Sequence, residues 1–340
     1  MNDNNKSIFC KLLFISFIST SAFSQNIERL IYSDFGLAFT LINPDERTSS
    51  MGGNGVSNSE NANAIFTNFS LSSFNEHKHG VNISFVPGIM NEGGNLFNLS
   101  GSYAVADDHT IGISARYLNL DAINYSDINN NPAGVAEPYA YEISVAYAFQ
   151  LSQNFSIGLR PKYIFANMAP GHQFQGIDIQ SGKSIAADIS FSYFKKLNSN
   201  RDRFTVGFNM VNIGGRISYL VPINDQEEIF HIPSLAIVGL SYERFLSDKW
   251  TTTVSAAYNY KYKDISEITP NWSIGNELTY HDKVSLRFGY EQQNLNDFTF
   301  DVILFGLGIK HKAISIDLGY QFSKELINDN QVRLSMGTMF

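Results

Sequence analysis

Apolar and polar residues alternate with a period of two through most of this chain. Between residues 284 and 291, Val284, Leu286, Phe288 and Tyr290 fall on one face, and polar or small residues occupy the other. Successive side chains of a β-strand point to opposite faces, so this pattern predicts strands with one oily face and one wet face. The segments that begin at residues 155 and 314 repeat the pattern.

The alternation divides residues 80–340 into fourteen predicted strands. They are 80–86, 95–104, 110–119, 141–150, 153–165, 184–195, 203–219, 233–245, 249–261, 272–280, 283–291, 299–310, 313–321 and 332–340. Most reach the roughly nine residues that a tilted strand needs to cross a hydrocarbon layer. Strands of soluble proteins usually have about five or six residues.

The connectors between these strands alternate between short and long. The short ones are 106–109, 151–152, 197–202, 246–248, 281–282 and 311–312, whereas most of the others are longer, as in 121–140 and 167–183. An even number of strands with short turns at one end and long loops at the other is typical of bacterial outer-membrane barrels. A soluble β-sandwich is the alternative, but its turns have no such two-sided difference in length.

We therefore predict an all-β fold, a fourteen-stranded antiparallel transmembrane β-barrel over residues 80–340. It would lie in the outer membrane, with short turns and both termini on the periplasmic side. The chain ends in Phe340, on the same face as Val332, Leu334 and Met336. We predict that this terminal aromatic residue is the assembly signal of the barrel and part of its closing strand.

The first 79 residues differ from the rest. Residues 1–24 have the features of a secretory signal peptide, with Lys6 ahead of an apolar run and small residues, Ala22 and Ser24, at its end. The only cysteine, Cys10, lies there, so the mature chain would have no thiol for a disulfide or a metal. Residues 25–79 are rich in Gly, Ser and Asn, and we predict that they form a plug inside the barrel.

Composition excludes several classes of function. No stretch after residue 24 approaches the roughly eighteen apolar residues of a membrane helix, and the mean hydropathy is -0.13. A net charge of -8 argues against nonspecific nucleic-acid binding. Aromatic residues make up 14% of the chain and charged residues 16%, which suits apolar bands with interfacial girdles.

Charged residues at alternate positions of the predicted strands fall on the face that would line the lumen. They are Arg116, Glu142, Arg160, Lys162, Asp188, Glu243, Arg287 and Asp317. They could form a polar conduit or a docking surface. We favour an ion-pair network that fills the interior and braces the plug, because inward charge is normal in these folds.

Two local patterns resemble binding loops only superficially. Gly52, Gly53 and Gly55 are not followed by the Gly-Lys-Ser/Thr of a phosphate loop, so tight turns are the better interpretation. The residues at 127, 129 and 131 have calcium-loop spacing, but Pro132 stands where that loop needs glycine. No Ser, His and acid set shows an activating neighbourhood, so we expect neither an enzyme nor a cofactor.

Three stretches carry a resemblance to a known family. Residues 41–47 (LINPDER) with 51–56 (MGGNGV) and 61–64 (NANA), residues 208–219 (FNMVNIGGRISY) and residues 186–189 (AADI) resemble the PorV/PorQ proteins of the type IX secretion system in Bacteroidetes, and PorV more closely. The plug motif comprises Pro44, Asp45, Arg47, Met51, Gly52, Gly53 and Gly55. Residues 67–70 (TNFS) depart from the family pattern by retaining Asn68 and losing a proline.

The resemblance implies a FadL-like barrel of fourteen strands with an N-terminal plug. It also implies a nonenzymatic role, in which cargo is bound by its C-terminal signal domain at the translocon barrel and passed to the surface attachment complex. In gliding members of the phylum the same system exports adhesins. The alternatives are a FadL-like transporter of hydrophobic small molecules and a passive structural barrel.

Overall fold

A computed structural model describes residues 37, 39–75, 77–89, 94–126, 132–167, 170, 173–174, 177–178, 181–197, 201–219, 228–263, 271–295, 298–323 and 330–340. The predicted signal peptide and the first part of the predicted plug lie outside the described residues. None of the helices in the described part of the chain is long and apolar enough to span a membrane.

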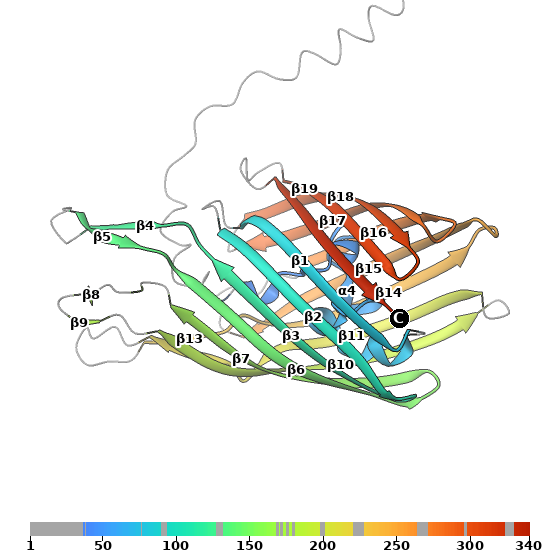
Figure 1. Ribbon diagram of the computed structural model, residues 1–340, viewed down its shortest axis with the longest axis horizontal. Helices are drawn as coiled ribbons and strands as arrows, with labels where there is room; N and C mark the ends of the chain where they lie inside the picture. The colour runs from blue at the N-terminus through green and yellow to red at the C-terminus, as the bar shows by residue number, and fades with distance from the viewer. Residues whose placement is uncertain are drawn as a thin grey trace, which may run out of the picture. The chain divides into compact units, whose positions relative to one another are not determined.

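Fourteen antiparallel strands of the described chain form a closed barrel (Figure 1). They are β1 (His79–Ile89), β2 (Gly94–Ala106), β3 (His109–Asn119), β6 (Tyr139–Ser152), β7 (Phe155–Asn167), β10 (Gly182–Leu197), β11 (Asp202–Ile213), β14 (Ser234–Phe245), β15 (Trp250–Lys263), β16 (Asn271–Tyr280), β17 (Val284–Leu295), β18 (Phe298–His311), β19 (Ile314–Ser323) and β20 (Gln331–Met339). The predicted fold class is confirmed, and each predicted strand corresponds to one of these.

The first and last strands close the barrel. β1 pairs with β20 from Gly80 opposite Met339 to Phe85 opposite Leu334. The register continues into the last residue, since the backbone N–H of Phe340 donates to the His79 carbonyl at 2.9 Å and that of His79 donates back at 3.0 Å. The chain therefore ends inside the wall, as its apolar final residues predict.

The period-two alternation sorts side chains between the two faces of the wall. On β17, Leu286 and Phe288 are 59% and 50% exposed, whereas Arg287 between them is 7% exposed. The outward face is therefore apolar, as a lipid-facing wall requires, and the polar face points inward.

One predicted strand is too long. The segment 203–219 is not a single strand, because β11 ends at Ile213 and the chain turns at Asn212 and Gly214, whose φ angles are 61° and 82°. Residues 216–219 form β12 (Arg216–Tyr219), which pairs with β13 (Glu228–His231) in a separate hairpin. The apolar positions change from even to odd numbers between Met210 and Val211, so the alternation shifts face just before the turn, and the single predicted strand ignored that shift. Glycine permits the left-handed backbone at the turn.

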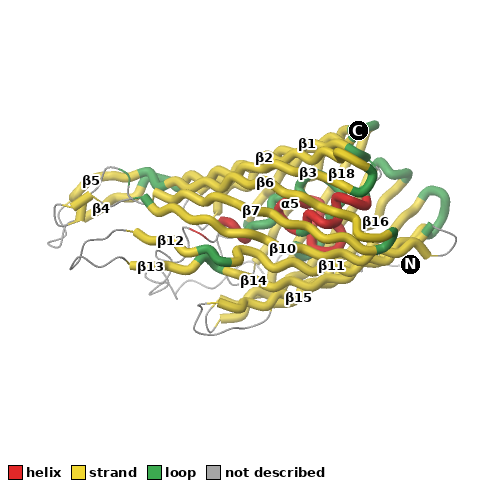
Figure 2. Tube along the Cα trace, turned by 90° about the horizontal axis from the view of Figure 1, so that it is seen from below, coloured by secondary structure: helices red, strands yellow, loops and turns green. Residues whose placement is uncertain are grey.

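Two further hairpins occur in connectors for which no strands were predicted. They are β4 (Ile123–Ser126) with β5 (Pro132–Ala136), and β8 (Gln173–Phe174) with β9 (Ile177–Asp178). Figures 1 and 2 together show β4, β5, β12 and β13 at the same end of the barrel strands, away from the C-terminus. The long connectors thus share one end.

The N-terminal segment folds into helices of one or two turns among the barrel strands (Figure 2). These are η2 (Phe39–Leu41), α3 (Glu46–Ser49), α4 (Gly55–Asn58), α5 (Ala64–Thr67) and η3 (Phe69–Phe74). Asp45 caps α3, because its carboxylate accepts from the Thr48 backbone N–H at 3.3 Å. Helices this short have no stability of their own, so contact with the wall must hold this plug together.

Inward-facing glycines let the plug backbone approach the wall closely. A Cβ at Gly275 on β16 would lie 2.6 Å from the Cα of Met51, and a Cβ at Gly207 on β11 would lie 2.6 Å from the Val56 carbonyl carbon. Neither position has room for a side chain. Gly158 and Gly289 also face plug backbone, whereas other inward glycines face plug side chains: Gly112, Gly239, Gly306 and Gly319.

Gly275→Val should therefore destabilise the folded barrel strongly, since the new side chain would overlap plug backbone and overpacking costs about 1–3 kcal/mol or more. The unfolding temperature measures this stability. It is the temperature above which the protein no longer migrates on a gel as the faster folded form. Gly101→Val is the matched control, because the added Cβ would meet Ile113 at an ordinary 3.7 Å. Equal unfolding temperatures for the two variants would contradict the close approach.

Candidate functional site

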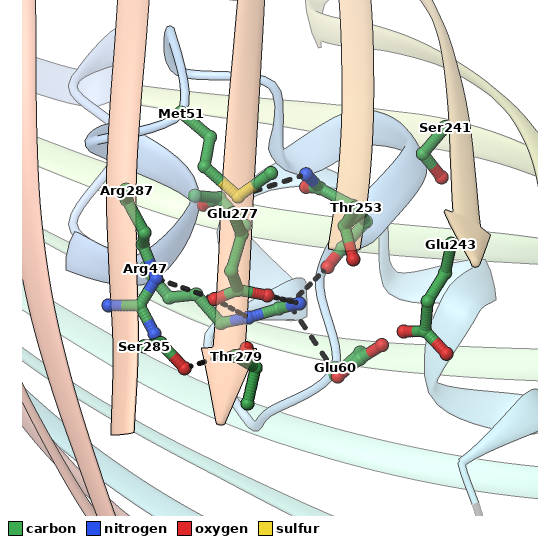
Figure 3. A network of polar contacts seen from close by, with 12 residues as sticks. Arg47, Met51, Glu60, Ser241, Glu243, Thr253, Glu277, Thr279, Ser285 and Arg287 are labelled. Atoms are coloured by element: carbon green, nitrogen blue, oxygen red, sulfur yellow. Dashed lines mark hydrogen bonds and ion pairs between the residues drawn. The ribbon is translucent and has the colours of Figure 1, made fainter. Parts of the chain in front are cut away.

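Arg47 on α3 joins the plug to the wall at the centre of a first ion-pair network (Figure 3). Its Nε and Nη2 donate to the two carboxylate oxygens of Glu277 at 3.1 and 2.7 Å, and Nη1 donates to the Asn58 carbonyl at 2.7 Å. Glu60 lies 3.6 Å from Nη1. A bidentate pair of this kind fixes orientation as well as charge.

The first network continues around the inner wall. Arg287 on β17 donates to Glu277 at 2.6 Å and to Asp317 on β19 at 2.7 Å. Arg203 on β11 pairs with Glu60 at 2.8 Å and with Glu243 on β14 at 2.5 Å. Each of these buried or half-buried charges therefore has an opposite partner, which offsets part of the cost of removing it from water.

A second network lies on β3, β6, β7 and β10. Arg160 donates to Glu142 and, at 3.0 Å, to Asp188, while the Lys162 ammonium lies 2.7 Å from Asp188. Arg116 lies 3.6 Å from Glu142, and its Nη1 donates to the carbonyls of residues 39, 40 and 42 at 2.9, 3.1 and 3.0 Å. This network also holds the plug, because Arg116 binds backbone carbonyls of the plug rather than plug side chains.

All eight charged residues predicted for the lumen lie on the inner face of the wall, in these two networks. The plug motif turns the chain tightly between them. Gly52 and Gly53 have φ angles of 77° and 71°, which glycine adopts without strain. Asp45 also accepts from the Asn61 side chain at 2.7 Å and so links two blocks of the motif. Pro44 and Met51 are buried.

Several buried residues of the site were missed from the sequence. Glu277 and Arg203 are central to the first network, and Glu277 occupies the inward parity of its predicted strand, so the alternation could have found it. Asn68 donates to the Val56 carbonyl at 2.7 Å and to Ser192 on β10 at 3.0 Å. The only indication of Asn68 in the sequence was that residues 67–70 retain it while they depart from the family pattern.

Asn212 is a second missed amide, at the left-handed turn after β11. Its backbone N–H donates to Asp188 at 2.8 Å, and its side chain donates to Thr40 of the plug at 3.0 Å and to the Pro233 carbonyl at 2.6 Å. The second network, the plug and both ends of the β12–β13 hairpin therefore meet at this residue.

An apolar layer separates the second network from the long connectors. Leu96, Leu118 and Ala140 follow one another across β2, β3 and β6, and each is fully buried. Ile217 and Ile232, beside the left-handed turn, belong to the same packed cluster together with Phe39 of the plug. The interior is thus filled by packed side chains at this level.

A hollow of about 620 Å³ lies on the outward face of the wall. It is lined mostly by exposed apolar residues such as Ile83, Phe97 and Tyr117, and the buried residues Ser84, Asn98 and Arg116 also border it. Among the described residues, no group of three or more His, Cys, Asp or Glu could hold a metal. The calcium-like spacing at 127, 129 and 131 lies outside the described residues.

The family model for "Type IX secretion system protein PorV" matches residues 24–263. The match covers more than two thirds of the chain and includes the described plug and the contacts of the second network with it. The chain belongs to the PorV family. The predicted resemblance is confirmed, and outer-membrane localisation follows from the family and the barrel together. None of the curated proteins that were searched matches this PorV-family chain.

Solved structures similar to this PorV-family barrel are of the FadL type. The CymD monoaromatic hydrocarbon channel has a TM-score of 0.57 at 15% identity, over 88% of this chain and 98% of that one. The Pseudomonas putida toluene transporter TodX has 0.53 at 12%, over 86% and 96%. A Pseudomonas aeruginosa FadL homologue has 0.52 at 12%, over 88% and 97%. At these identities the likeness shows the fold alone.

Glu46 on α3 should make the plug of this PorV-family barrel sensitive to pH. Burial raises the pKa of its carboxyl from 4.5 to about 8, with Arg333, Asp45, Arg287 and Asp317 as the charges around it. The folded state thus holds this proton more tightly than the unfolded chain does. The stability that the protonated Glu46 carboxyl contributes is complete below about pH 4.5 and is lost as the pH rises through about 8.

We therefore expect Glu46→Gln to remove this part of the pH dependence and to unfold at a higher temperature than the wild type at pH 9. The unfolding temperatures of both proteins, followed by gel mobility at pH 5 and pH 9, measure this difference. Asp107→Asn is the control, because the Lys78 ammonium holds the pKa of that turn carboxyl below its usual range, outside this window. Parallel pH profiles for wild type and Glu46→Gln would show that Glu46 is ionised throughout.

Proposed function

We propose that this protein is a shuttle subunit of a type IX secretion system. It binds the C-terminal signal domain of secreted cargo at the translocon barrel and delivers the cargo to the surface attachment complex. The observation that carries this proposal is the PorV family match over residues 24–263. That match includes the plug motif and the left-handed turn at Gly214, which are features of the interior and of a connector.

The filled interior supports a role at the rim rather than in the lumen. Arg47 and Arg116 tie the plug to opposite parts of the wall, and the apolar layer at Leu96 and Leu118 is fully buried. Opening a path would require breaking bidentate pairs inside a low-dielectric interior, which costs about 3–5 kcal/mol for each buried partner removed. A stable barrel that presents its connectors to protein partners requires no such step.

The role we propose is nonenzymatic. Neither PorV proteins nor FadL-type barrels are known as enzymes. The buried ionisable side chains of both networks pair with one another, and they hold the plug through Arg47, Arg116 and Asp45. Their arrangement serves packing rather than proton transfer to a substrate.

Transport of a hydrophobic small molecule is the second candidate, favoured by the FadL-type fold and by the 620 Å³ hollow. The structural relatives include a monoaromatic hydrocarbon channel and a toluene transporter. The hollow, however, is lined by outward side chains of the wall such as Phe97 and Tyr117, where lipid would contact it. A pocket between plug and wall would support transport more directly.

Cargo contact should depend on the end that carries the long connectors. Val135 on β5 is 59% exposed there, and Val135→Glu should reduce crosslinked recovery of cargo with a C-terminal signal domain severalfold. Lys249→Glu, in the short turn before β15, is the control and should leave recovery unchanged. Capture of translocon barrel and cargo from native membranes is the measurement. If the wild type captures neither, the shuttle role is wrong.

The same end should face the cell exterior, with both termini periplasmic. In a Cys10→Ser background, a membrane-impermeant maleimide should label Val135→Cys on intact cells and should label Asp282→Cys only after the outer membrane is broken. Both positions are exposed in the structure. If only Asp282→Cys were labelled on intact cells, the orientation of the barrel would be the opposite of the one proposed.

A further inference from the structure

Four inward polar residues form a row on adjacent strands near the second network. Ser335 on β20 faces Ser84 on β1, Ser84 faces Asn98 on β2, and Asn98 faces Arg116 on β3. The exposed fraction of each residue is 7% or less. Residues that face one another across strands have Cβ atoms about 5 Å apart, so these side chains are neighbours.

The row contains polar atoms without hydrogen-bond partners. They are the hydroxyls of Ser335 and Ser84, both side-chain atoms of Asn98, and Nε and Nη2 of Arg116. Leaving a buried polar group unpaired costs about 1–3 kcal/mol. In the next inward row toward the short turns, Ser100 donates to Asn63 of the plug at 2.7 Å and Asn82 accepts from Asn63 at 2.8 Å. There only the Asn82 amide nitrogen lacks a partner among these three residues.

The charge beside this row is also unbalanced. Among the described residues, the second network has three cations, Arg116, Arg160 and Lys162, and two anions, Glu142 and Asp188, which leaves one positive charge in excess. The largest charge effects on Arg116, Glu142, Lys162 and Asp188 come from within this network. An uncompensated buried charge is strongly unfavourable, so a counter-charge is expected here.

The free atoms are mostly donors and are arranged around the positive end of the network. The Phe66 ring covers the face of the Arg116 guanidinium at 4.3 Å, and Nη1 is used by plug carbonyls. The Nη2 hydrogens lie in the guanidinium plane and have no partner, whereas Nε makes no hydrogen bond but lies 3.6 Å from a Glu142 carboxylate oxygen. The Asn98 amide and two hydroxyls can donate beside Nη2. On the other side, Leu96 and Leu118 exclude water.

We propose that this row binds one small monovalent inorganic anion, such as chloride, between Arg116, Asn98, Ser84 and Ser335. The anion neutralises the excess positive charge of the second network and accepts hydrogen bonds from the donors that the protein leaves unpaired. It also stabilises the plug, because the same guanidinium holds the carbonyls of residues 39, 40 and 42. The inference does not depend on the cargo-shuttle role.

The direct test uses bromide as the probe on the full-length protein purified in detergent. Crystals grown with bromide in place of other halides should show one anomalous peak within hydrogen-bond distance of Arg116 Nη2 or Nε and the Asn98 amide. Water-sized density there without an anomalous signal would overturn the proposal. This measurement needs no variant and so does not depend on a variant that folds.

Stability provides the second test. At constant ionic strength, replacing gluconate by bromide should raise the unfolding temperature by about 3 °C or more, as expected for a ligand that binds only the folded state. Asn98→Asp supplies a negative charge beside Arg116, so it should abolish the bromide effect. Ser255→Ala, at another unpartnered serine on β15, is the matched control and should keep it. A bromide effect that persists in Asn98→Asp would contradict the assigned site.

Discussion

In a hydrocarbon layer every backbone N–H and C=O must find a partner inside the protein, and the rest of this structure depends on that constraint. The pairing of β1 with β20, extended by the reciprocal bonds between His79 and Phe340, removes the two edges that an open sheet would expose to lipid. Closure in turn defines an interior, and it divides each strand into an apolar outer face and a polar inner one. The position of every other feature follows from that division.

The closed wall creates a lumen that must be filled, and the plug fills it by two physical means. Inward glycines such as Gly207 and Gly275 allow backbone to touch backbone, which gives contact area without side chains. Arg47 and Arg116 then supply orientation, the first through a bidentate carboxylate and the second through plug carbonyls. Because the plug helices have only one or two turns each, their conformation is a consequence of contact with the wall. A rigid, filled barrel is a suitable scaffold for partners that contact its rim.

Much of this arrangement could be predicted from the sequence, and the failures have identifiable causes. The period of two located all fourteen barrel strands, because the alternation repeats regardless of what the strand contacts. The prediction failed at residues 203–219, where one strand was drawn through a change of apolar parity at Met210 and Val211 and a left-handed turn at Gly214. It placed Arg116 and Asp188 on the inner face, yet it could not show that Asn212 joins Asp188 to Thr40, since those contacts connect residues far apart in the chain.

The sequence by itself determined the fold class, the number of strands, the direction in which each side chain points and, through the plug motif, the PorV family. These properties are local: they follow from strand periodicity, connector length and short sequence motifs within one stretch of chain. Only the tertiary structure decided which charges pair, which glycines admit the plug and where polar atoms stay unpaired. Barrel closure sets those relations by bringing Glu277 to Arg47 across 230 residues of sequence, and no local pattern encodes a distance of that kind.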